Sequence, residues 1–325
     1  MYITKLLTIE DYEEFEMIYD DFYSKAKSEY NFELDPLDYN GFLDSLEKKF
    51  IDCVVLYDNH RIMGFLVYTT AISEAIELNI IHCTDSEKYQ AYSAELLKKF
   101  LELTEHTRQS KIVCYPMLGN QKSLIATVVK EGFQFVGIEV LRFKTQNDES
   151  IERFKRARTV DLPANYRITG WDTKYLNDAV RVILESFNNS SDALFDPRFK
   201  TLSGCNDIIT KVVNDVYAKF LPEATSVLLY NEQPVGFSFM NITNNSIVNI
   251  PLVGVTEEHQ GKGLSTLMLK RSMNEILNNR VMSNVEEINT TTETNNLQAL
   301  RLYKNLGFLE DYDYPQAYLP ISNFK

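Results

Sequence analysis

The chain has 325 residues, 44% hydrophobic and 24% charged, an ordinary balance for a globular protein, and its length predicts two domains. Its 46 acidic and 33 basic residues give a formal net charge of −13. That excess argues against a nucleic-acid-binding surface. It is compatible with attraction of a cationic substrate, or simply with solubility.

The start of the chain shows neither the apolar run nor the cleavage pattern of a signal peptide, and no stretch approaches the ~18 apolar residues of a membrane span. We therefore expect a cytoplasmic protein with no membrane partner. The cysteines are widely spaced and form no CxxC pair, which indicates free, mostly buried thiols. The four histidines form neither an HExxH motif nor a Cys/His cluster, so no metal is expected.

An internal similarity runs through the chain. Residues 53–65, "CVVLYDNHRIMGF", resemble residues 226–237, "SVLLYNEQPVGF", and both predict a hairpin. The predicted turns hold Asp58-Asn59 in the first copy and Asn231-Glu232 in the second. Further pairs of similar segments have nearly the same spacing: 2–15 with 166–179, and 131–143 with 306–320. The pattern indicates a tandem duplication of a domain-sized unit.

The predicted boundaries follow from this repeat. We expect one domain at 1–145, a polar linker at 146–163 that ends in Pro163, and a second domain at 164–325. A short helix is compatible with 151–158 within the linker.

The second copy alternates helical and strand patterns. The periodicity predicts helices at 179–187, 206–220, 264–279 and 297–305, and strands at 226–230, 235–242, 246–255, 285–291 and from 308 onward. Strands mixed with helices in this order predict an α+β (mixed α/β) fold with helices covering a sheet.

A glycine-bearing segment, "QGKGLS" at 260–265, lies between a predicted strand and a predicted helix. It is not a Walker loop, because Gly263 follows the lysine and Thr256 stands where the first glycine belongs. It fits a dinucleotide fingerprint poorly, because Thr266 takes the place of the third glycine. The remaining interpretation is a turn at a helix N-terminus, where free backbone N–H groups and the helix dipole favour an anion.

Two motifs in this copy carry a family resemblance. Gln260, Gly263 and Ser265 match the Q/R-x-x-G-x-G/A signature of the GCN5-related N-acetyltransferases, with serine where the family has glycine or alanine. A second signature follows about 35 residues later, "NLQALRLYKNLGF" at 296–308. Its matching positions are Asn296, Ala299, Leu302, Tyr303, Gly307 and Phe308. The chain thus resembles two tandem acetyltransferase-like domains, each with a central, mostly antiparallel, splayed mixed sheet flanked by helices.

The resemblance implies acetyl-CoA as the donor. Its pyrophosphate would lie on the backbone of Gln260, Gly261, Lys262, Gly263, Leu264 and Ser265. Its pantetheine arm would pair like a strand with Leu252, Val253, Gly254 and Val255, and would contact Asn296. Backbone N–H groups near 253–255 would polarise the thioester carbonyl. Tyr303 would protonate the CoA thiolate, a feasible transfer because phenol and thiol have similar pKa values.

The first copy lacks the matching residues. Alignment of the copies places Lys88, Tyr89 and Ala91 opposite Gln260, Gly261 and Gly263, and Val128 opposite Tyr303. We therefore expect a degenerate domain without an acetyl-CoA site.

Several residues keep alternative roles at this stage. The general base is open between Glu293, Asn249, Glu257 and water. Asp192 and Asp196 either recognise a cationic amine or cap a helix, and Lys262 is either a phosphate ligand or a solvated turn residue. His259 is expected to be exposed, and Gly307-Phe308 to be a helix C-cap followed by a core aromatic.

These features predict an acetyl-CoA-dependent N-acetyltransferase that acts on a primary amine of a small molecule by direct attack in a ternary complex. A non-catalytic acyl-CoA-binding sensor or scaffold, and an acyltransferase with a longer acyl-CoA or a protein acceptor, are the alternatives. Both a monomer and a homodimer are compatible with the sequence.

Overall fold

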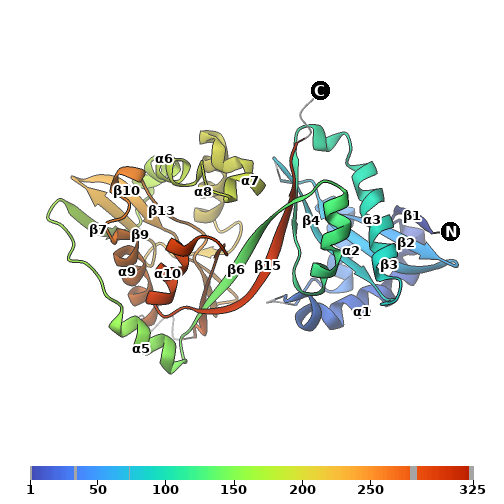
Figure 1. The fold of residues 1–325 in the computed structure, drawn as a ribbon, viewed down its shortest axis with the longest axis horizontal. Coiled ribbons are helices and arrows are strands. Elements are labelled where there is room, and N and C mark those ends of the chain that lie inside the picture. The colour runs from blue at the N-terminus through green and yellow to red at the C-terminus, as the bar shows by residue number, and fades with distance from the viewer. Residues whose placement is uncertain (1, 33–34, 73, 279–283, 322–325) are drawn as a thin grey trace. The chain divides into compact units, whose positions relative to one another are not determined.

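The computed structural model describes the chain except for residues 1, 33–34, 73, 279–283 and 322–325 (Figure 1). The chain divides into two compact units, one formed by residues 1–136 together with 314–325, the other by residues 137–313. Each unit has its own strands and helices, and each has its own hydrophobic core.

The last strand of each sequence copy belongs mainly to the other unit. Strand β6 (Gln134–Lys144) pairs antiparallel with β14 (Glu287–Glu293) of the second unit. The end of β15 (Leu309–Leu319) pairs antiparallel with β5 (Ile112–Pro116) of the first unit. The compact units therefore differ from the predicted ranges by an exchange of strands. The boundaries at 145 and 164 stay a prediction about the repeat.

The first unit is a sheet covered by helices on both faces. Val54 and Leu56 pack in one core cluster with helix α3, whereas Cys53 and Val55 pack in another with α1 and α2. Successive strand side chains point to opposite faces, so a run that is apolar throughout requires a cover on each face. The elements, in chain order, are β1 (Ile3–Leu6), α1 (Tyr12–Tyr30), α2 (Tyr39–Glu47), β2 (Asp52–Asp58), β3 (Arg61–Thr69), β4 (Ala75–Cys83), α3 (Tyr89–Leu103), β5, η3 (Gly119–Leu124) and α4 (Ile125–Lys130).

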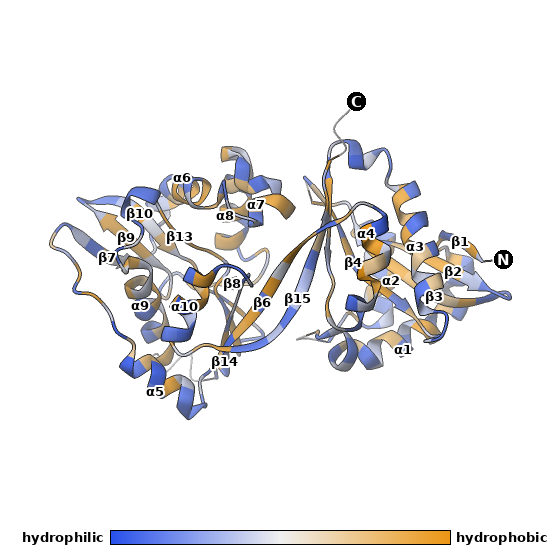
Figure 2. Ribbon diagram, in the orientation of Figure 1, coloured by the Kyte–Doolittle hydropathy of each residue, from blue (hydrophilic) through white to orange (hydrophobic). Residues whose placement is uncertain are grey.

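The second unit contains two sheets. One has the strand order β6-β14-β12-β11-β8 and the other β13-β10-β9-β7. Figure 2 shows orange, hydrophobic segments along the strands and on parts of the helices that flank them. The elements not yet named are α5 (Asp148–Arg156), β7 (Tyr166–Gly170), α6 (Leu176–Phe187), α7 (Asp192–Phe195), η5 (Pro197–Lys200), α8 (Leu202–Val213), β8 (Lys219–Phe220), β9 (Ser226–Tyr230), β10 (Gln233–Ser238), β11 (Asn241–Thr243), β12 (Ile247–Asn249), β13 (Val253–Val255), η6 (Glu257–His259), α9 (Leu264–Asn278) and α10 (Leu297–Asn305).

The strand predicted at 246–255 is in fact two strands in different sheets. β12 pairs in parallel with β14, whereas β13 pairs antiparallel with β10. Pro251 lies between them and has no N–H to donate. Beyond it the chain leaves β14, and β13 becomes the terminal strand of the four-stranded sheet. The two sheets therefore part on the side of β13 that β10 does not occupy.

Other predicted elements differ at their ends. The helix predicted to reach residue 220 stops at Val213, because Asp215 adopts a left-handed φ of 62° and Phe220 enters β8. The first hairpin turns at Asn59-His60, one residue later than predicted, whereas Asn231-Glu232 turns as predicted. Both turns use two consecutive left-handed residues, which fits the duplication. A helix does form in the predicted linker, as α5.

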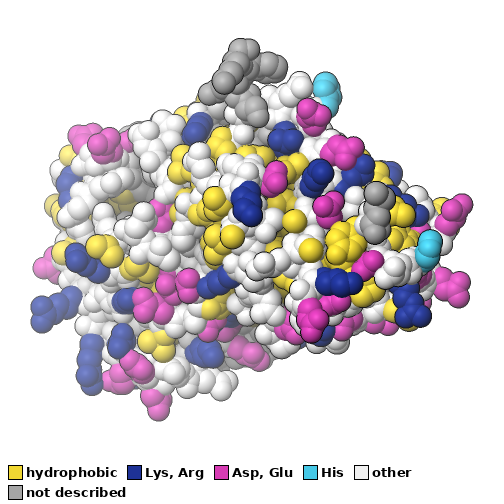
Figure 3. All heavy atoms as spheres, turned by 45° about the vertical axis from the view of Figure 1, so that its right-hand side comes forward, with side chains coloured by type: hydrophobic (Ala, Val, Ile, Leu, Met, Phe, Trp, Pro, Cys, Tyr) yellow, Lys and Arg dark blue, Asp and Glu magenta, His cyan; other side chains and the backbone are white. Residues whose placement is uncertain are grey.

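The distribution of apolar and charged residues in the structure agrees with what the composition predicts. No helix among the described residues is long and apolar enough to cross a membrane. On the face drawn in Figure 3, basic and acidic side chains are interspersed. The net negative charge is therefore not gathered into a single acidic patch on that face.

Gly307 and Gly261 offer a matched test of packing in the second unit. Both have positive φ, 91° and 73°, but a Cβ at Gly307 would overlap the carbonyl oxygen of Ser150, whereas a Cβ at Gly261 would meet nothing within 4 Å. We expect Gly261→Ala to lower the free energy of unfolding by about 1 kcal/mol and Gly307→Ala by about 3 kcal/mol or more, as measured by urea denaturation. Equal losses would contradict the tight packing of α5 against Gly307.

Candidate active site

A cleft of about 230 Å³ opens where the two sheets of the second unit part. It brings together eight of the twelve residues predicted from the sequence for donor binding and catalysis, which are Val253, Gly254, Val255, Gln260, Gly261, Ser265, Asn296 and Tyr303. These residues come from β13, from the turn before α9 and from α10. Their convergence is a property of the fold, because they span about 50 residues of sequence.

The other four predicted residues do not line the cleft. Leu252 and Leu264 are buried at 5% and 2% exposure and serve the core. The Lys262 ammonium donates to the carbonyl oxygen of Glu258 at 3.0 Å, which stabilises the turn. Gly263 lies under the linker, where a Cβ would approach a methyl group of Val160 to 3.2 Å. Direct donor contacts by these four residues remain a prediction.

The glycine turn has the backbone that the sequence predicts. Gly261 and Gly263 adopt φ values of 73° and 75°, a region that strongly favours glycine, and α9 begins at Leu264. The Gln260 side-chain amide donates to the carbonyl oxygen of Val255 at 2.8 Å and so joins the turn to β13. The free N–H groups at the start of α9 and the edge of β13 that has no strand partner are therefore held close together.

Helix α6 forms the opposite wall. A Cβ at Gly254 would approach the hydroxyl oxygen of Ser186 to 2.8 Å, so glycine permits α6 to lie against β13. The Ser186 hydroxyl is buried and has no hydrogen-bond partner among the described residues. Sequence reasoning missed Ser186, Phe187, Ser190 and Gln298 as lining residues, since no motif marks them.

Asn296 and Tyr303 lie at the two ends of α10. The Asn296 side chain caps the helix by accepting from the N–H of Ala299 at 3.1 Å. Tyr303 is 6% exposed and packs edge-to-face on Phe308, with ring centroids 5.4 Å apart. Phe308 is fully buried and Gly307 ends the helix, as predicted. Burial and the charge of Asp192 raise the pKa of Tyr303, against a hydrogen bond with Thr290, so the phenol keeps its proton.

Asp192 and Glu293 place two carboxylates in the same cleft. Burial, followed by the charge of Glu293, raises the pKa of Asp192 to about 6, although a hydrogen bond from Ser190 opposes the shift. A carboxylate with that pKa is ionised at neutral pH and can still accept a proton. Asp196 is a capping residue, which is one of the two roles that the sequence predicts for it. Its side chain caps η5 and pairs with the Arg198 guanidinium at 2.7 Å.

The remaining candidates for a base are less favourably placed. Glu257 is exposed at the start of η6, and the Asn249 amide donates to Thr243 at 3.1 Å; neither lines the cleft. His259 was predicted to be exposed, and this is wrong. It is 7% exposed, its Nδ1 lies 2.7 Å from the Tyr166 hydroxyl, and its ring lies beside Tyr230. His259 is therefore a buried residue that packs next to the glycine turn.

Comparisons with known proteins agree with this geometry. Residues 203–308 match the family model described as the acetyltransferase (GNAT) family. This segment is a GNAT domain. The match supports acyl transfer in general by this part of the chain and includes every residue that lines the cleft except Ser186, Phe187, Ser190 and Asp192. No curated protein matches the chain at a significant level.

Solved structures extend the likeness in fold to the whole chain. A tandem GNAT protein from the clavulanic acid biosynthesis pathway is 14% identical, with a TM-score of 0.62 and 100% of both chains covered. A GCN5-related N-acetyltransferase from Sphaerobacter thermophilus is 12% identical, with a TM-score of 0.65, and covers 98% of this chain and 96% of its own. At these identities the likeness shows the tandem GNAT fold alone.

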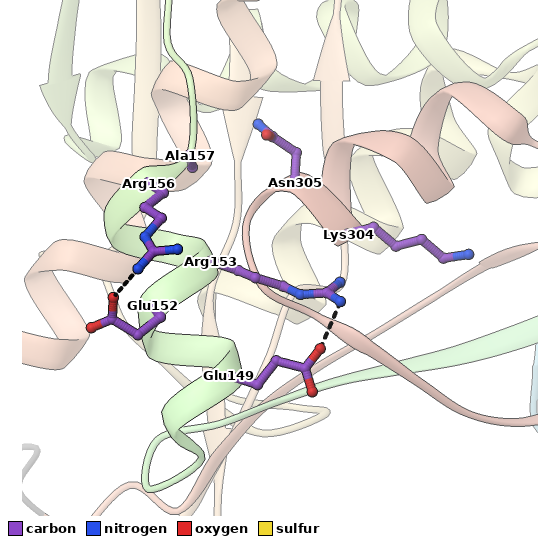
Figure 4. A pocket seen from close by; sticks show the side chains of 7 residues that line it. All are labelled: Glu149, Glu152, Arg153, Arg156, Ala157, Lys304 and Asn305. Carbon is purple, nitrogen blue, oxygen red and sulfur yellow. Dashed lines mark hydrogen bonds and ion pairs between the residues drawn. The ribbon is translucent and has the colours of Figure 1, made fainter.

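A second hollow of about 460 Å³ lies between α5 and the end of α10 in the same unit (Figure 4). Its cations are already paired. Arg153 meets Glu149 at 2.6 Å, Arg156 meets Glu152 at 3.2 Å, and Lys304 meets Glu310 at 2.6 Å. Its lining contains neither Tyr303 nor any residue of β13.

The first unit shows how its copy departs from the GNAT domain. Helix α3 begins at Tyr89, with no glycine turn before it, and Val128 is fully buried without a hydroxyl to offer. The absence of an acetyl-CoA site there stays a prediction. Within the described residues no group of three or more His, Cys, Asp or Glu side chains could hold a metal ion.

Proposed function

We propose that the GNAT domain transfers acetyl from acetyl-CoA to a primary amine of a small molecule. One observation carries this proposal: a single cleft combines the open edge of β13, a glycine turn at a helix N-terminus and a buried tyrosine. These are a surface for an amide-rich arm, a site for a pyrophosphate and a proton donor for a thiolate.

The donor would bind along the parting of the sheets. The free edge of β13 offers backbone groups at Val253 and Val255 to the pantetheine amides, and Asn296 lies across from that edge. Backbone N–H groups of the turn from Gln260 to Ser265 would hold the pyrophosphate, with Lys262 adding positive charge nearby. Gly261 leaves the open space that such a bulky group needs.

The residues of the cleft divide the proton transfers between them. Asp192 takes the proton of the ammonium acceptor, and the free amine nitrogen attacks the thioester carbonyl in a ternary complex. A C–N bond forms and the C–S bond breaks. Tyr303 then gives its proton to the departing thiolate. Backbone N–H groups of β13 stabilise the charge on the carbonyl oxygen. Glu293 adds negative potential, which favours a cationic acceptor.

The size of the cleft supports a small acceptor. About 230 Å³ is below the range of ~300–1,000 Å³ that is usual for small-molecule sites. All four cysteines are free and buried, which fits a reducing compartment, and we place the reaction in the cytoplasm. We treat the active form as a monomer or a homodimer. A non-catalytic acyl-CoA sensor, a longer acyl donor and a protein acceptor are the competing outcomes of the tests below.

Donor binding depends on the glycine turn. Gly261→Glu places a bulky carboxylate at the space proposed for the pyrophosphate, and its Cβ would meet no atom within 4 Å. We expect it to weaken acetyl-CoA binding at least about 100-fold by calorimetry, whereas Gly261→Ala weakens it less than about tenfold. Undiminished binding in Gly261→Glu would contradict the site, and no binding by the parent chain would contradict the function.

Tyr303 is expected to act in the chemical step. Tyr303→Phe keeps the ring on Phe308 and removes the proton, so kcat should fall by about 10²–10³ while the dissociation constant of acetyl-CoA changes less than about threefold. Tyr230→Phe, in the same unit but outside the cleft, is the matched control and should leave kcat unchanged. Loss of donor affinity in Tyr303→Phe would instead indicate a packing role. Turnover absent from the parent chain with a broad amine panel would favour the sensor.

The protonation of Asp192 should be visible in the pH dependence of kcat/KM. Its pKa of about 6 predicts that kcat/KM falls as the pH drops through 6, because the protonated acid cannot accept the amine proton. Asp192→Asn should lower kcat/KM by about 10²-fold at neutral pH and remove that limb of the profile. Asp196→Asn is the control and should keep it. A limb near 6 that persists in Asp192→Asn would assign the base elsewhere.

A further inference from the structure

The first unit contains a hollow of about 580 Å³ that the proposed reaction does not use. It lies at the end of β4, between the last turn of α1 and the starts of α3 and η3. Its walls are rich in hydrogen-bonding groups, among them Glu29, Tyr30, Cys83, Glu87, Tyr89 and Asn120. Relative to its own sheet it occupies the place that the catalytic cleft occupies in the GNAT domain. It lacks a glycine turn, and Tyr89 stands there instead.

A relay of three hydrogen-bonded side chains determines whether the Tyr30 hydroxyl can donate or accept a hydrogen bond in this hollow. The Tyr30 hydroxyl lies 2.7 Å from Nδ1 of His82, and Nε2 of His82 lies 2.9 Å from a carboxylate oxygen of Asp21. Both Tyr30 and His82 are buried, at 2% and 1% exposure. The hydrogen bonds thus connect Asp21 in α1 to His82 in β4, and His82 to Tyr30 at the end of α1.

The relay has one consistent arrangement of protons. Burial alone would raise the pKa of Asp21, but hydrogen bonds from Lys25 and His82 outweigh it and lower the pKa, so the carboxylate is ionised and accepts from Nε2–H. Burial lowers the pKa of His82, so the ring is neutral and Nδ1 carries a lone pair. Tyr30 must then donate its proton to Nδ1, and its oxygen has only lone pairs left for a ligand.

The charged side chains around the hollow also favour a ligand that donates hydrogen bonds. Lys25 pairs with Asp21 at 2.9 Å, which neutralises the one cation in its lining. Glu29 accepts from the side-chain amide of Asn120 at 2.9 Å, and Glu87 adds a second carboxylate. A ligand therefore meets two carboxylates and the Tyr30 oxygen, beside the Tyr89 hydroxyl, which has no hydrogen-bond partner among the described residues.

The wall that carries Glu29 is also rigid. Gly119 begins η3 with a φ of 54°, and a Cβ there would overlap the carbonyl oxygen of Glu29. Only glycine lets η3 lie so close to the end of α1, which brings Asn120 within reach of the Glu29 carboxylate. The acceptor groups are thus held before any ligand arrives.

We propose that this hollow is a binding site for a small organic molecule with a protonated primary amine. Tyr30 accepts a hydrogen bond from the ammonium group and Glu29 supplies the counter-charge. The proposal is independent of acetyl transfer, since every group it uses belongs to the first unit. It gives the first copy a ligand of its own, different from the donor proposed for the second copy.

Cys83 provides a local reporter because it is one of the residues that line the hollow. Three primary amines (ethanolamine, tyramine and galactosamine) and their N-acetyl derivatives are tested, without acetyl-CoA, for protection of Cys83 in the full-length chain. Labelling by methyl methanethiosulfonate is followed by peptide mass spectrometry. We expect at least one free amine to slow labelling saturably by about fivefold or more, and no N-acetyl derivative to do so. Cys205, buried in the second unit, should label at an unchanged rate.

Variants separate the proposed contacts from general stability. Tyr30→Phe and Glu29→Gln should each raise the half-protecting concentration about tenfold, the effect of one hydrogen bond to a charged group. Tyr23→Phe, exposed on the same helix, is the matched control for Tyr30→Phe. Asp192→Asn should leave protection intact, which distinguishes this site from the proposed acceptor cleft.

Three results would overturn the proposal. They are no protection by any of the amines, equal protection by the N-acetyl derivatives, and protection that survives unchanged in both Tyr30→Phe and Glu29→Gln.

Discussion

The parting of β12 and β13 at Pro251 is the constraint on which the candidate active site depends. Up to Ile250 the backbone still pairs with β14, where the Ile250 N–H donates to Asn289 at 2.9 Å. After Pro251 the partner is β10. Because a strand cannot pair with β14 and diverge from it at once, the edge of β13 is left without a strand partner on one side. That edge and the cleft beside it both depend on this change of partner.

The cleft also concentrates charge in a way that the separate residues do not show. Asp192 and Glu293 come from a short helix and from the end of a strand, about 100 residues apart. Their proximity, together with burial, brings the pKa of Asp192 near neutrality. Burial and the charge of Asp192 also raise the pKa of Tyr303, so both groups hold a proton more firmly than they would in water. The proposed assignment of a base and an acid to one cleft depends on this arrangement.

The duplicated architecture has diverged at equivalent places. In the GNAT domain two left-handed glycines precede α9, whereas α3 of the first unit begins directly at an aromatic residue. The position of the proposed general acid is a tyrosine in one copy and a buried valine in the other. The first unit contains the relay of Tyr30, His82 and Asp21. The exchanged strands β6 and β15 complete each unit with sequence from the other copy.

The sequence by itself determined the duplication, the mixed α/β class and both family signatures, and with them eight of the residues that line the cleft. Local rules suffice for these features, because glycine turns, helix ends and hairpins depend on neighbours in the chain. α10 and β9 accordingly form at the residues predicted. Only the tertiary structure decided the strand exchange, the division of residues 246–255 between two sheets, and the burial of His259. It also placed Asp192, and neither Glu257 nor Asn249, in the lining of the cleft, and it revealed the relay in the first unit. Each of these depends on pairing or proximity between residues far apart in sequence, which no local pattern records.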